Sequence, residues 1–76
     1  SITNPNQVGS VINPNGNVIS EITPLIMIVN KYGKNAKDNY NALIEAGSDP
    51  NKKINYYDND RSAYDLAMLY RSEILS

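Results

Sequence analysis

The sequence predicts an all-α fold, a stack of helical repeats in which helix-turn-helix units are linked by long hairpin-like loops. Three observations lead to this prediction. Thr23-Pro24-Leu25 opens an apolar run, the block Ala-Gly-Ser-Asp-Pro-Asn at 46–51 closes a helical pattern, and Ser62 opens a second run. Repeat proteins typically show this order of a helix start, a helix end, an extended link and a second helix start. Such proteins work by offering a surface to a partner.

Composition narrows the classes of function. A chain of 76 residues forms at most one small domain. Its net charge of -1 comes without the basic patch of a nucleic-acid-binding protein. The chain has no Cys and no His, which removes disulfides, the best nucleophile and the commonest general base. We therefore expect a non-catalytic protein that binds neither nucleic acid nor a cofactor.

Neither a membrane nor a metal site is predicted. The longest apolar stretch, 25–29, is far shorter than the ~20 residues that span a bilayer, and the first residues lack the features of a signal peptide. Asp58-Asn59-Asp60 starts like a calcium loop, but Ala63 stands where the loop needs Gly and Leu69 where it needs Glu. We expect no membrane binding and no metal. The expected location is the cytoplasm, or a host cytosol if the protein is delivered there as an effector.

The first part of the chain is expected to be disordered over 1–7, where polar residues surround Pro5. From 8 to 22, Asn15-Gly16 lies between apolar residues and predicts a β-hairpin, because both residue types tolerate positive φ. A plain surface loop is the alternative. In the repeat scheme, 8–22 is the tail of a preceding repeat.

The first predicted helix begins after Thr23. This residue can cap the helix through its hydroxyl, and Pro24 suits the first helical position, where its missing N–H costs nothing. The apolar run 25–29 is typical of a helix buried between neighbours, although a short buried strand has the same composition. Proline would remove a ladder hydrogen bond from a central strand, so we favour the helix, ending at 30–33.

The second helix begins at Asn35, with Asp38 three residues later in the arrangement of a capping box. One helical face carries Ala36, Tyr40, Leu43 and Ile44. Gly47 is expected in the left-handed conformation at the end of this helix, and Pro50 prevents its continuation.

Residues 51–61 form a long polar excursion, which Asp58-Asn59-Asp60 is expected to turn. The third helix begins at Ser62, again with Asp65 three residues later. A break at Arg71-Ser72 precedes the start of a fourth helix. Together these boundaries divide residues 8–76 into the tail at 8–22, a full repeat at 23–61 and a partial terminal repeat at 62–76.

With these motifs in place, the chain resembles the ankyrin repeat family. Thr23-Pro24-Leu25 is similar to that family's Thr-Pro-Leu-His-x-Ala opening, and the block at 46–51 to the end of its second helix. The resemblance covers residues 8 to about 75. Ile26 stands in place of the motif His, and the spacing of Thr23 and Ser62 exceeds the usual 33 residues by about six. The finger at 52–61 is therefore expected to be unusually long.

The resemblance implies a protein-binding module whose partner, of unknown identity, contacts the finger and the concave surface of the helices. Tyrosine is enriched at binding hot spots, and Tyr56 or Tyr57 is the expected anchor unless the pair folds back to close a small core. Tyr40 and Tyr64, in contrast, are expected in the core. The remaining candidate contacts on the finger and the helix ends are Lys52, Lys53, Asn55, Asp58, Asn30, Lys31, Tyr32, Leu69 and Tyr70.

Three other possibilities stay open from the sequence. The chain could be the terminal capping segment of a larger repeat or multidomain protein, which would stabilise it. It could be an inhibitor or immunity-type protein that covers the active site of a partner enzyme. Self-association is a further way to cover helical faces that a short chain leaves exposed.

Overall fold

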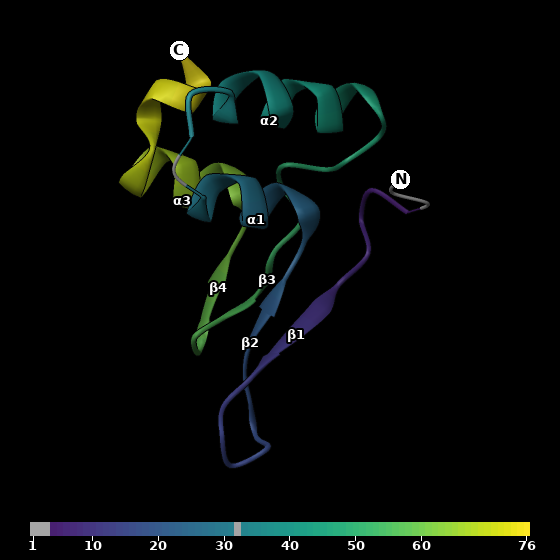
Figure 1. The fold of residues 1–76 in the computed structure, drawn as a ribbon, viewed down its shortest axis with the longest axis vertical. Helices are drawn as coiled ribbons and strands as arrows, with labels where there is room; N and C mark the ends of the chain where they lie inside the picture. Colours follow the sequence, from purple (N-terminus) through teal and green to yellow (C-terminus); the bar gives the residue numbers. More distant parts are fainter. Residues whose placement is uncertain (1–3, 32) are drawn as a thin grey trace.

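The prediction of an all-α repeat stack is wrong. The computed structural model describes residues 4–31 and 33–76 and is a small α+β fold, with no helical repeat solenoid in these residues (Figure 1). Two antiparallel two-stranded sheets accompany three α-helices and a short 3₁₀ helix. The elements in chain order are β1 (Gly9–Ile12), β2 (Val18–Ile22), α1 (Pro24–Asn30), α2 (Ala36–Glu45), β3 (Ile54–Tyr56), β4 (Asn59–Arg61), α3 (Ala63–Tyr70) and η1 (Ser72–Leu75).

The first hairpin, β1–β2, is confirmed, but its turn differs from the predicted one. Ile12 pairs with Val18, so five residues connect the strands instead of two. The Asn13 side chain accepts hydrogen bonds from the amides of Asn15 and Asn17, both at 3.0 Å. Within this loop, only Gly16 adopts a positive φ, at 86°. The loop is therefore built around an asparagine side chain, and glycine serves it at one position.

The second hairpin, β3–β4, was expected as a long hairpin-like finger between helices, and its paired strands explain part of the fold-class error. Its central residues are Tyr57 and Asp58, with φ of 47° and 68°. Two consecutive positive φ values define the type I′ turn, whose twist matches that of paired strands. The turn thus begins one residue before the predicted Asp58-Asn59-Asp60. Asp58 belongs to a residue type that tolerates positive φ, whereas Tyr57 rarely adopts this conformation.

The helix starts follow the predicted chemistry in two cases of three. Thr23 Oγ1 accepts the Ile26 amide at 3.3 Å, with Pro24 at the first position of α1. Ser62 and Asp65 form the complete capping box of α3. Asn35 makes no side-chain capping bond, so the box predicted for α2 is wrong. Gly47 ends α2 at φ 108°, as expected.

The core lies among the helices, at one end of the molecule, while the two hairpins extend from it in the same direction (Figure 1). α1 packs against both α2 and α3, and η1 in turn contacts α2 and α3. Tyr40 is buried as predicted, whereas the core prediction for Tyr64 is wrong, since 42% of this residue is exposed. The buried apolar residues are Leu25, Ile26, Val29, Ala36, Tyr40, Ile54, Ala63, Leu66, Ala67 and Ile74.

Candidate functional site

Two side chains of β2 hold the second hairpin beside the first. The Glu21 carboxylate accepts the amide of Asn55 at 2.7 Å, and the Ser20 hydroxyl accepts the amide of Tyr57 at 3.3 Å. Ser20 is fully buried. These bonds replace a backbone ladder between the two sheets. They fix the position of the predicted finger residues 55–57 relative to the helices.

A hollow opens where this finger meets the ends of two helices. It has a volume of about 310 Å³, and we call it the tyrosine hollow; it is lined by Val29, Asn30, Tyr56, Tyr70 and Arg71. The Tyr56 hydroxyl donates to Asn30 Oδ1 at 3.3 Å, which joins the finger to the end of α1. Tyr57 meets the Tyr56 ring edge to face, with ring centroids 4.8 Å apart. Three predicted contact residues, Asn30, Tyr56 and Tyr70, therefore border one hollow.

Arg71 organises this hollow and was not predicted as a site residue. Its guanidinium donates to the carbonyls of Lys31 at 2.6 Å and Val29 at 3.3 Å, and so satisfies carbonyl groups at the end of α1. Its Nε donates to Glu73 at 2.9 Å, and this bond lowers the pKa of the Glu73 carboxyl. Only 14% of the Arg71 side chain is exposed. The sequence offers no local signal for this role, because a basic residue after a helix is expected to bind carbonyls of its own helix, whereas Arg71 binds those of α1.

The other predicted residues do not gather at the tyrosine hollow. Lys53 pairs with Asp65 at the start of α3. Leu69 and Lys53 border a separate hollow of about 250 Å³. Lys52, Asn55 and Asp58 are exposed along the finger, and Tyr32 lies outside the described residues. The predicted contact residues are thus divided between these two hollows, and Lys31 lines a third.

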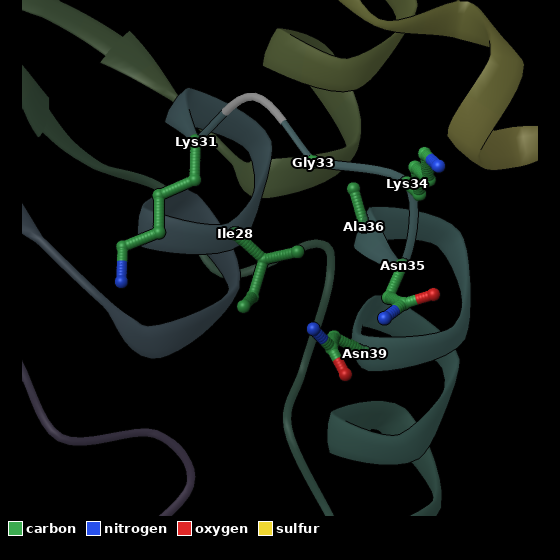
Figure 2. Close-up of a pocket in the computed structure, with 7 residues that line it drawn as sticks. All are labelled: Ile28, Lys31, Gly33, Lys34, Asn35, Ala36 and Asn39. Carbon is green, nitrogen blue, oxygen red and sulfur yellow. The ribbon is translucent and has the colours of Figure 1, made fainter.

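A third surface lies between α1 and α2. Figure 2 shows a hollow of about 230 Å³ in which Ile28 and Asn39 point toward the space between the helices, whereas the Lys31 side chain runs away from it. A neighbouring hollow of about 420 Å³ continues along Ile28, Ala42, Leu43 and Ala46. The apolar character of this surface follows from the predicted face of α2, part of which stays uncovered.

The acidic residues of the described part of the chain form no candidate metal site. Within 4–31 and 33–76 no three acidic side chains cluster in a way that could hold a metal ion. The carboxyl of Asp65 has a pKa lowered to about 2 by the hydrogen bond from Lys53 and by the Ser62 amide. The Ser62 contact belongs to the capping box of α3, and the Lys53 contact is an ion pair at the start of this helix. None of the helices in this part of the chain has the length and apolar character needed to cross a bilayer.

Comparisons with protein-family models, with curated proteins and with solved structures found no match to this chain.

Proposed function

We propose that this protein is a non-catalytic binding module that recognises a protein partner through the tyrosine hollow. The observation that carries the proposal is Tyr70, of which 72% is exposed at the rim of a hollow whose walls are already fixed. A large exposed aromatic ring on a rigid helix loses little entropy when it is covered by a partner. Tyrosine and arginine are also enriched among residues that dominate binding free energies.

Preorganisation of the walls supports the same proposal. Tyr56 is half-buried, bonded to Asn30 and packed against Tyr57, so its ring does not have to be ordered on binding. Arg71 is fixed by the carbonyls of α1. Lower ordering costs leave more of the contact free energy for affinity.

The test is a selection of displayed random peptides against the complete chain, followed by calorimetry with the selected peptide. Tyr70→Ala should weaken binding by about 30-fold, equivalent to about 2 kcal/mol for a hot-spot residue. Tyr56→Phe, which removes only the hydroxyl bonded to Asn30, should weaken binding less. Tyr64→Ala is the matched control, because Tyr64 is exposed outside the hollow. Equal affinity for wild type and Tyr70→Ala would reject the proposed surface.

A second candidate function is a structural one, in which the chain packs against another part of a larger protein. The hollow along Ile28, Ala42, Leu43 and Ala46 favours it, because uncovered apolar helix faces are typical of interfaces. Leu43→Ser should then leave the isolated chain folded but prevent its stabilisation by adjoining segments in an extended chain. A thermal melt of the short and extended chains, each with and without the substitution, measures this difference.

A further inference from the structure

The second hollow, between α3 and the β3–β4 hairpin, combines exposed apolar side chains with positive charge. We call it the arginine hollow; its volume is about 250 Å³ and its lining residues are Lys53, Arg61, Asp65, Met68 and Leu69. Leu69 is 61% exposed and Met68 is 55% exposed. Two large apolar side chains therefore lie at the surface beside two cations.

The charges of this hollow are not balanced. Lys53 is paired with Asp65. The Arg61 guanidinium donates to the Asp60 carbonyl at 2.9 Å but forms no ion pair with any carboxylate in the described part of the chain. The Asp60 side chain cannot offset it directly, because successive side chains of a strand point to opposite faces. The hollow consequently presents one guanidinium that lacks an anionic partner beside an apolar surface.

At the opposite edge of the same hairpin, a carboxylate accepts an outward-pointing backbone amide. Asn55 and Asp60 are paired in register, and the Asn55 amide points outward to the Glu21 carboxylate. In an antiparallel pair of this type the Asp60 amide points outward from the other edge. That edge therefore carries the Asp60 amide and the Arg61 guanidinium, both of which are donors suited to a carboxylate.

We propose that the arginine hollow binds an acidic amphipathic protein segment, in which a carboxylate lies within one helical turn of two large apolar side chains. The carboxylate pairs with Arg61, and the apolar side chains cover Met68 and Leu69. Methionine adapts its shape to a partner, which suits this contact. The inference rests on the proposed function as a binding module and adds the chemistry of a partner at a second surface.

The probe is a capped helical peptide of about 14 residues, or four turns, with Leu along one face and Glu beside each Leu. Two companion peptides replace every Glu by Lys or every Leu by Ser. Amide chemical shifts of the isotope-labelled complete chain are recorded during titration. We expect the Glu–Leu peptide alone to shift the signals of Arg61, Met68 and Leu69.

Charge reversal makes the test specific. Arg61→Glu should weaken binding of the Glu–Leu peptide at least tenfold and strengthen binding of the Lys–Leu peptide by a similar factor. Arg61→Gln should weaken binding of the Glu–Leu peptide without strengthening binding of the Lys–Leu peptide. Lys37→Glu is the matched control, since it makes the same change of charge on an exposed residue of α2 that lines neither the arginine hollow nor the tyrosine hollow; it should alter either affinity less than threefold. Circular dichroism spectra of all variants verify that they are folded.

Several outcomes would overturn the inference. Shifts confined to Tyr56 and Tyr70 would reject it while leaving the proposed function in place. Equal binding of the Glu and Lys peptides, or no shift with any peptide, would also reject it. Sedimentation showing a dimer that Met68→Ser dissociates would identify a second copy of the chain as the occupant instead.

Discussion

Removing a single oxygen atom from the core should make this protein more stable. Tyr40 is only 2% exposed, and its hydroxyl has no hydrogen-bond partner among residues 4–31 and 33–76. A buried polar group without a partner costs about 1–3 kcal/mol. Tyr40→Phe retains the ring and its packing but removes the polar atom. We therefore expect the free energy of unfolding to rise by about 1 kcal/mol, near the lower end of that range.

Urea unfolding followed by far-UV circular dichroism measures this change. For a slope of about 1 kcal/mol/M, typical of small proteins, the midpoint should rise by about 1 M. The thermal midpoint should rise by about 4–8 °C for a domain of this size. Tyr64→Phe is the matched control, because 42% of Tyr64 is exposed, and it should change stability by less than about 0.5 kcal/mol.

The free energy of unfolding at alkaline pH provides an independent test of the same hydroxyl. Burial, and secondly the nearby Tyr64, raise the pKa of Tyr40 above its ordinary value of 10.0. The folded chain therefore holds this proton more tightly than the unfolded chain. Its contribution is intact below about pH 10 and is lost as the pH rises toward the folded pKa. The stability difference between Tyr40→Phe and wild type should widen above about pH 10.

A decrease in the free energy of unfolding would contradict an unpaired Tyr40 hydroxyl. If Tyr40→Phe lowered the free energy of unfolding by about 1 kcal/mol, the hydroxyl would have to make a hydrogen bond in solution. A gain of equal size for the control Tyr64→Phe would show that the effect comes from general apolarity instead.

Three further predictions concern the core, the helix cap and the connection between hairpins. Leu66→Ala should lower the free energy of unfolding by about 2–5 kcal/mol because it leaves a cavity, whereas Leu69→Ala at the surface should change it by less than about 0.5 kcal/mol in the same urea assay. Asp65→Asn should lower the thermal midpoint at neutral pH. Because the pKa of Asp65 is lowered in the folded chain, the higher midpoint of the wild type should disappear as the pH falls from about 4 to about 2. A wild-type advantage that persists at pH 2 would contradict a stabilising role of the ionised Asp65 carboxylate. Ser20→Ala should speed amide hydrogen exchange at Tyr57, whose N–H bonds the Ser20 hydroxyl, and unchanged exchange there would show that this bond does not hold the finger.

The parts of the fold that local chemistry determines could be predicted from the sequence. Thr23 and Ser62 lie within three residues of the amides that they accept, so their capping roles can be inferred from neighbouring residue types. Gly47 ends α2 for the same kind of reason, since a left-handed residue is needed there. The phase of α2 also predicted that Tyr40 is buried. It could not show that Tyr64 is exposed, because that depends on which elements cover α3.

The site was only partly predictable, for a related reason. Asn30, Tyr56 and Tyr70 were candidates because of residue type and position on a helix end or finger. Arg71 was missed because its bonds to the carbonyls of α1 join residues about forty positions apart. Nothing near Arg71 in the sequence indicates those acceptors. The division of the candidate residues between two hollows is likewise set by packing.

The second hairpin shows why the fold class was wrong. Tyr57 is a poor choice for a turn that needs two positive φ values, and an isolated hairpin of this length is marginal at best in water. What favours it here is contact with β2, where Ser20 and Glu21 accept amides of the hairpin. These acceptors precede the hairpin by more than thirty residues. The same two side chains that make the fold hard to predict also place the finger, so recognition at the tyrosine hollow should depend on β2 although β2 does not line it.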